Sequence, residues 1–160
     1  MPPRYRAGDP QIAECIESVT ETIDEHVIVC GFGRTGQNVA ELLRRRHHPY
    51  VALDLDPSRV HVAQAADILV AYGDATRRSV LEAAGVERAR ALVITFDEPR
   101  TAERVIHQVR ALHTTIPILV RTRDDAHYEA PIGRFNITTT TWRSWCQATR
   151  GFIVAGSKPE

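Results

Sequence analysis

The chain has 160 residues, and its 20 basic and 20 acidic side chains give a formal net charge of zero. This length predicts one globular domain, and the zero charge argues against a protein that binds nucleic acid mainly through the phosphates. Nineteen of the 20 basic residues are arginines and the single lysine is Lys158, which excludes a P-loop lysine and a Schiff-base lysine from the body of the chain.

Residues 1–25 are expected to form a lead-in helix and linker. Ile12, Ile16, Val19 and Ile23 recur at spacings of four, three and four, which predicts a helix with one apolar face. Two roles are open for it: it covers its own domain, or it packs on a neighbouring protein and couples the domain to it. No apolar run approaches the length of a membrane-spanning helix, and the three cysteines lack metal-type spacing, which favours reduced thiols and a cytoplasmic protein.

From residue 26 onward, short apolar runs alternate with segments of helical periodicity. The expected strands are 27–30, 51–53, 68–71, 91–94 and 117–120. The expected helices are 34–46, a segment opened by Asp56 and Pro57, 77–84 closed by Gly85, and about 15 residues capped by Asp97. This alternation predicts an α/β fold: a Rossmann-like parallel sheet of five or six strands with helices on both faces.

The alternation weakens near residue 130, so we divide the chain into an α/β body, 26–130, and an atypical tail, 131–160. Residues 1–130 hold 16 arginines and 19 acids, a net charge of −3, whereas residues 131–160 hold four basic residues and one acid, a net charge of +3. Residues 136–142 contain four consecutive threonines, and we expect one last strand there. No regular structure is expected for residues 143–160.

A G-x-G-x-x-G motif follows the first predicted strand and opens the next helix. It consists of Gly31, Phe32, Gly33, Arg34, Thr35 and Gly36. In such motifs the first glycine permits a tight turn, the second lets the backbone approach a pyrophosphate, and the third lets the helix pack closely on the strand. The N–H groups and partial positive charge of the helix N-terminus then attract the phosphates.

Asp54 indicates which dinucleotide this motif would bind. It ends the next predicted strand, 18 residues after Gly36, which is the position that the dinucleotide-binding pattern requires. A carboxylate there accepts hydrogen bonds from a ribose diol and repels a 2′-phosphate. The sequence therefore favours NAD(H) over NADP(H).

Further candidate residues follow the other strands, because ligands of such sheets bind beyond the carboxyl ends of the strands. Asp74, Ala75 and Thr76 would line the adenine, although a plain turn with Asp74 as a helix cap explains them equally well. Thr95 follows the fourth strand. Arg121 follows the fifth and would pair with a phosphate or a carboxylate, with surface ion pairing as the alternative.

Several linked segments resemble one known family. The segments are HVIVCGFGRTGQNVAELL, VALDLDPSRV, YGDATRRSVLEAAGVERARALVITFDEP and ILVRTRDDAHYEA. They resemble the TrkA-N family, also called KTN or regulator-of-conductance-of-potassium (RCK) domains, and most of all the cytoplasmic domain of Kef-type cation:proton antiporters. The resemblance covers about residues 26–130. It departs from the glutathione-gated Kef proteins at Glu41 and Ala66, where those have an arginine and an aromatic residue, so glutathione gating is not implied.

The resemblance implies a homodimeric Rossmann-like domain that binds NAD(H), with AMP, ADP or ATP as the alternatives. It implies control of potassium or cation transport by a membrane partner, in trans or as part of a longer chain, and a cytoplasmic place at the inner face of the membrane through that partner. No nucleic-acid partner is expected. By motif, the nucleotide would be lined by Gly31, Gly33, Arg34, Gly36, Asp54, Asp74 and Thr76.

An NAD-dependent oxidoreductase fragment or subunit is the alternative function. A dehydrogenase needs a place for its second substrate, and nothing of similar size follows the body of about 100 residues. The chain also lacks a Tyr-x-x-x-Lys pair, because its lysine is near the end. We therefore expect a nucleotide sensor and not an enzyme, with no catalytic residues and no metal site.

Overall fold

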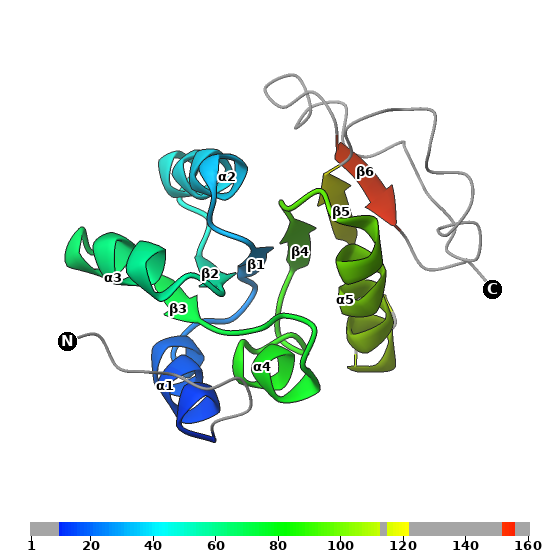
Figure 1. Cartoon of the computed structure of the whole chain (residues 1–160), viewed down its shortest axis with the longest axis horizontal. Helices are drawn as coiled ribbons and strands as arrows, with labels where there is room; N and C mark the ends of the chain where they lie inside the picture. Colours follow the sequence, from blue (N-terminus) through cyan, green and yellow to red (C-terminus); the bar gives the residue numbers. More distant parts are fainter. Residues whose placement is uncertain (1–9, 113–114, 122–151, 156–160) are drawn as a thin grey trace.

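The computed structural model describes residues 10–112, 115–121 and 152–155, which form one layered α/β unit (Figure 1). The strands are β1 (Val27–Cys30), β2 (Tyr50–Asp54), β3 (Val70–Tyr72), β4 (Ala91–Ile94), β5 (Ile118–Arg121) and β6 (Phe152–Ala155). They form one sheet in the order β3-β2-β1-β4-β5-β6. All pairings among β1 to β5 are parallel, so this part is the doubly wound sheet predicted from the sequence.

Helices cover both faces of the sheet. They are α1 (Pro10–Thr20), α2 (Arg34–Arg45), α3 (Pro57–Ala65), α4 (Arg78–Ala83) and α5 (Pro99–Leu112). Helices α2 and α3 lie on one face, and α1, α4 and α5 lie on the other (Figure 1). Alternate residues of β1 supply the two cores: Val27 and Val29 pack under α2 and α3, whereas Ile28 and Cys30 pack under the other three helices. Burial of both strand faces is what the apolar runs predicted.

Several predicted element boundaries differ from the observed ones by one or two residues. Strands β1 and β4 match the prediction, and β3 begins two residues later than expected. Gly85, with φ +73°, closes α4 as predicted, because its N–H donates to the carbonyl of Glu82. Helix α5 was expected to be capped by Asp97, but the residue directly before it is Glu98. The Glu98 carboxylate accepts from the Thr101 hydroxyl at 2.8 Å.

The sixth strand lies where no regular structure was expected. Strand β6 pairs antiparallel with the edge strand β5, from Ile118 opposite Ala155 to Arg121 opposite Phe152. The segment 136–142, for which a strand was predicted, lies outside the described residues. The expectation for residues 143–160 was wrong at β6. The run Phe152–Ala155 is apolar and bounded by Gly151 and Gly156, which is a strand signal that the sequence analysis passed over.

Helix α1 takes the first of its two possible roles and packs on its own domain. Ile12 and Ile16 are buried against the core beside α4 and β3. At its end, the Thr20 hydroxyl donates to the carbonyl of Ala83 at 2.6 Å. Arg88 donates to the carbonyl of Thr20 at 3.0 Å, which ties the helix to the segment after α4. Helix α1 is therefore part of the folded unit.

A buried histidine lies next to this junction. His26 has no exposed surface, and its Nε2 is 2.8 Å from the carbonyl oxygen of Ala84. Since a carbonyl oxygen only accepts hydrogen bonds, Nε2 carries the proton, and Nδ1 has no partner among the described residues. Burial lowers the pKa of His26. The hydrogen bond to the Ala84 carbonyl partly opposes this shift, and the nearby Arg88 guanidinium adds a smaller lowering effect.

The stability of the domain should therefore depend on the protonation of His26. Its pKa is below 6.5 in the folded chain, so unfolding takes up a proton at pH values between the lowered pKa and 6.5. The free energy of unfolding should therefore decrease as the pH falls through that window. Protonation of His26 accounts for a decrease of at most about 1.4 kcal/mol per pH unit. Urea unfolding at pH 5 to 8 should show a weaker pH dependence for His26→Gln, and an identical dependence in both chains would contradict this role.

Candidate functional site

A cleft of about 450 Å³ opens at the carboxyl ends of the parallel strands, within the range of small-molecule sites. Eleven of the twelve residues predicted from the sequence line it. They are Gly31, Gly33, Arg34, Thr35, Gly36, Asp54, Asp74, Ala75, Thr76, Thr95 and Arg121. The loops after β1 to β4 and the end of β5 therefore converge on one site, as the topology predicts.

The twelfth residue, Phe32, contributes only its backbone. Its side chain is 2% exposed and packs in the core under α2 and α3, away from the cleft. Its N–H, however, donates to Oδ2 of Asp54 at 2.6 Å. Phe32 thus anchors the glycine turn on one side and orients the carboxylate of the cleft on the other.

Two of the three motif glycines are required by packing. Gly31 has φ +96°, and a Cβ there would lie 2.6 Å from Oγ1 of Thr95. A Cβ on Gly36 would overlap the carbonyl oxygen of Gly31, so α2 could not approach β1 as closely. Gly33 differs, because a Cβ there would meet no atom within 4 Å. Its position on the cleft is open, as the approach of a ligand to the backbone would require.

The Thr95 hydroxyl supports this turn from behind. It lies 2.9 Å from the carbonyl of Cys30 and 2.8 Å from that of Gly31, and it donates to these oxygens. The Thr95 N–H also donates to Cys30, at 3.0 Å. Thr95 was predicted as a ligand contact, and the structure gives its hydroxyl a second role in holding the end of β1 against β4.

Helix α2 presents its N-terminus to the cleft. It begins at Arg34, and the preceding Gly33 offers no side chain to cap it. The first N–H groups of the helix belong to Arg34, Thr35 and Gly36, which all line the cleft. Uncapped N–H groups and the helix dipole attract an anion, and the exposed Arg34 side chain adds a full positive charge.

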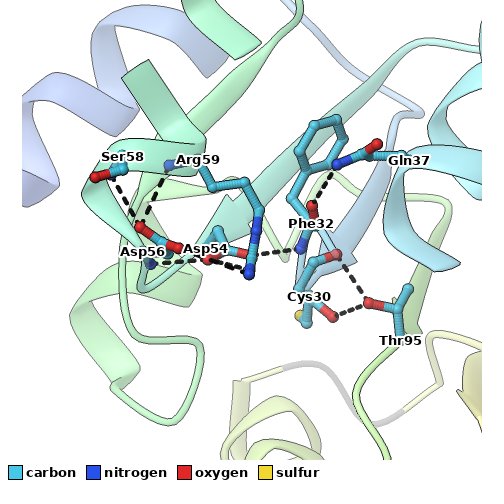
Figure 2. Close-up of polar contacts among 9 residues, drawn as sticks. Cys30, Phe32, Gln37, Asp54, Asp56, Ser58, Arg59 and Thr95 are labelled. Atoms are coloured by element: carbon cyan, nitrogen blue, oxygen red, sulfur yellow. Dashed lines mark hydrogen bonds and ion pairs between the residues drawn. The ribbon is translucent and has the colours of Figure 1, made fainter. Parts of the chain in front are cut away.

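Asp54 ends β2 and is 6% exposed, and Figure 2 shows the groups that hold its carboxylate. Its Oδ2 accepts from the N–H of Phe32, and its Oδ1 accepts from the N–H of Asp56 at 2.8 Å. Nη1 of Arg59 donates to both oxygens, at 3.0 and 2.9 Å. The sequence located this carboxylate at the end of β2, but it did not reveal that the guanidinium of Arg59 pairs with it.

The loop after β3 is a turn that the Asp74 side chain holds. Oδ1 of Asp74 accepts from the N–H and the hydroxyl of Thr76, at 2.9 and 2.6 Å. The turn that the alternative predicted is therefore present, but Asp74 does not cap α4, which begins at Arg78. Asp74, Ala75 and Thr76 also line the cleft.

Arg121 closes the far side of the cleft at the end of β5. Its Nη1 lies 3.5 Å from the carbonyl of Thr95, at the limit of a hydrogen bond. Within residues 10–112, 115–121 and 152–155, no carboxylate pairs with it. Arg121 therefore lines the cleft, as predicted from its place at the end of β5.

Comparisons with known proteins identify the family. The TrkA-N domain model matches residues 27–136. The chain belongs to the TrkA-N domain family. It is 43% identical over 105 residues to a putative K(+) efflux antiporter KefB of Alkalimonas amylolytica, covering 66% of this chain and 16% of that protein. It is 40% identical over 111 residues to the glutathione-regulated potassium-efflux protein KefC of Klebsiella pneumoniae, covering 68% of this chain and 18% of that protein.

A solved structure supports the same relationship. The AMP-bound Kef C-terminal domain of Shewanella denitrificans is 36% identical, with a TM-score of 0.54, over 62% of this chain and 59% of that one. The chain spans less than a fifth of the length of the two antiporters. None of the helices within the described residues of this TrkA-N domain combines the length and apolarity needed to cross a bilayer.

Gly73 and Phe96, which flank predicted site residues after β3 and β4, also line the cleft. The structure adds cleft residues of the TrkA-N domain that the sequence analysis missed. They are Leu53, Leu55, Arg59, Glu98, Thr101 and Val105. Leu55 directly follows a predicted site residue, so its place after a strand could have indicated it. Glu98 and Thr101 enter from the start of α5, and Arg59 enters from the start of α3; their positions depend on how each helix returns to the sheet. No group of three or more His, Cys, Asp or Glu side chains able to hold a metal occurs in the described part.

The two positions that differ from the glutathione-gated Kef proteins lie elsewhere. Glu41 and Ala66 line a second groove of about 690 Å³, shared by α2 and α3. The Glu41 carboxylate accepts from Arg44 and Arg45 at 2.8 to 2.9 Å, and hydrogen bonds from these arginines lower the pKa of Glu41 to about 2. This groove therefore presents an acidic residue that is already paired with its own helix.

Substitution of two motif glycines should distinguish the one that packing requires, Gly36, from the one that borders open space, Gly33. Gly36→Ala should destabilise the domain by about 1–3 kcal/mol, because the added methyl overlaps the backbone of Gly31. Gly33→Ala should leave stability unchanged or raise it by up to about 1 kcal/mol, because its φ of −69° suits alanine and the space is open. Thermal unfolding measures both, and equal midpoints for the two variants would contradict the assignment.

Proposed function

We propose that this TrkA-N domain binds an adenine nucleotide, with NAD(H) preferred and AMP, ADP or ATP as alternatives, and thereby controls potassium or cation transport by a membrane partner. The observation that carries the proposal is one cleft that joins two complementary elements. The uncapped N-terminus of α2 suits phosphates, and the buried carboxylate of Asp54 suits a ribose diol. The AMP bound to the related Kef C-terminal domain supports the assignment.

The residues present fit such a ligand. Arg34 and the first N–H groups of α2 would hold the phosphates, and Arg121 would add a second positive charge. Asp54 would accept hydrogen bonds from the ribose hydroxyls. The Asp74–Thr76 turn, together with the apolar surfaces of Leu55 and Phe96, would surround the base. Each part of the nucleotide thus meets a residue type that suits its charge and polarity.

The domain would act on transport through a change of arrangement. A nucleotide in this cleft would contact the loops after four strands and the first turns of α2, α3 and α5 at once. If the domain forms a homodimer with two arrangements, binding shifts their populations only when their nucleotide affinities differ. The relatives named as potassium efflux proteins support a membrane transporter as the partner, with this domain at the inner face of the membrane.

Sensing fits the cleft better than catalysis. Cys30, at the end of β1, is the one cysteine that the described structure places in the core beside the glycine turn. Burial raises the pKa of its thiol to about 12, which keeps it protonated and unreactive at neutral pH. The only lysine of the chain, Lys158, is near its end, so a lysine-dependent hydride transfer is not expected in this body. We therefore propose a sensor that does not transform its nucleotide.

Calorimetric titration tests this function directly. NADH, NAD⁺, AMP, ADP and ATP are titrated into the chain, and NADPH is titrated for comparison. We expect binding of NADH and weaker binding of NADPH. Asp54→Asn should weaken NADH binding by about ten-fold, since a hydrogen bond to a charged group contributes roughly 1.5–3 kcal/mol. It should also reduce the discrimination against NADPH.

The matched control is Glu87→Gln, which removes an exposed charge outside the cleft and should leave both affinities unchanged. Failure of all five nucleotides to bind the unaltered chain would overturn the proposed function. Unchanged NADH binding by Asp54→Asn would show that this carboxylate does not contact the ribose.

A further inference from the structure

Every acceptor position of the Asp54 carboxylate is occupied within the chain. A carboxylate offers about four lone-pair positions. Backbone N–H groups of Phe32 and Asp56 take one position on each oxygen, and Nη1 of Arg59 takes one more on each. A ribose diol has two hydroxyl donors, so it needs two of these four positions.

Only Arg59 can release its positions without disturbing the fold. The N–H of Phe32 belongs to the turn that joins β1 to α2, and the N–H of Asp56 belongs to the residue that caps α3. Arg59 holds Asp54 with a long side chain that is 41% exposed, and it lies on the first turn of α3. Rotation of that side chain is enough to free one position on each oxygen.

Asp56 offers the Arg59 guanidinium a second carboxylate. Nη2 of Arg59 lies 3.6 Å from Oδ2 of Asp56. Arg59 borders both the strand-end cleft and the second groove between α2 and α3. After release from Asp54, its guanidinium would remain beside the ribose on the first turn of α3. There it would offset the repulsion between the Asp54 carboxylate and a 2′-phosphate, and it would offer that phosphate a partner.

We propose that Arg59 is an internal competitor of the ribose diol and the residue that sets selectivity at the ribose 2′ position. The inference rests on the proposed nucleotide site. In the free chain Arg59 occupies the chelating position on Asp54, and a nucleotide with a free diol takes that position over. NADPH binding is assisted by the same arginine, so Arg59 narrows the difference in affinity that Asp54 alone would produce between NADH and NADPH.

The test compares NADH and NADPH dissociation constants in the intact chain, Arg59→Ala and Arg59→Lys. Arg59→Ala should bind NADH about two- to five-fold more tightly, because a partly exposed ion pair no longer has to be broken. It should bind NADPH more weakly, so that the ratio of the two constants rises about ten-fold. Arg59→Lys keeps the positive charge, and its ratio of dissociation constants should lie between those of the intact chain and Arg59→Ala.

Two further variants show whether the effect passes through Asp54. In the Asp54→Asn background, Arg59→Ala should no longer tighten NADH binding. Arg78→Ala provides the matched control, because Arg78 is also an ion-paired arginine on the first turn of a helix but does not border the cleft. It should leave both dissociation constants unchanged.

The outcomes separate this inference from the proposed function. An intact chain that binds neither NADH nor NADPH, together with an Arg59→Ala chain that binds neither, overturns the nucleotide site and the competition with it. An intact chain that binds NADH, with an unchanged ratio in Arg59→Ala, overturns the competition alone. Equal weakening of both ligands by Arg59→Ala also overturns it, because Arg59 would then be a direct contact to a phosphate that both share.

Discussion

The carboxylate of Asp54 links three elements of the fold that belong to different stretches of the sequence. It accepts from the turn after β1 through Phe32, from the loop after β2 through Asp56, and from α3 through Arg59. Because the carboxylate is 6% exposed, these hydrogen bonds replace the water that it would otherwise bind. The same bonds fix the distance between the N-terminus of α2 and the start of α3, so the shape of the cleft depends on this one side chain.

The sequence was sufficient to predict the frame around that carboxylate. Runs such as 27–30 and 91–94 are apolar throughout, as is typical of strands covered on both faces. Their alternation with helices leads to a parallel sheet, and a parallel sheet brings the residues after each strand to one edge. Eleven of twelve predicted residues line the cleft for this reason, although they come from five separate segments.

The remainder could not be predicted, since it depends on contacts between distant elements. No periodic pattern shows that Arg59 folds back onto Asp54, that the Phe32 side chain leaves the cleft, or that β6 adds to the edge of β5. The structure shows where the arginine-rich composition bears on the cleft. Among the described residues, the cations that line the cleft are Arg34, Arg59 and Arg121. Arg59 already pairs with Asp54, the carboxylate that we propose as the partner of the ribose.

A crystal structure of the domain with bound NADH would test the central role of Asp54 most directly. We predict phosphates at the N-terminus of α2, ribose hydroxyls within hydrogen-bond distance of both Asp54 oxygens, and a guanidinium of Arg59 that has left the carboxylate. A nucleotide bound outside this cleft, or one bound within it while Arg59 still holds both oxygens of Asp54, would contradict this role.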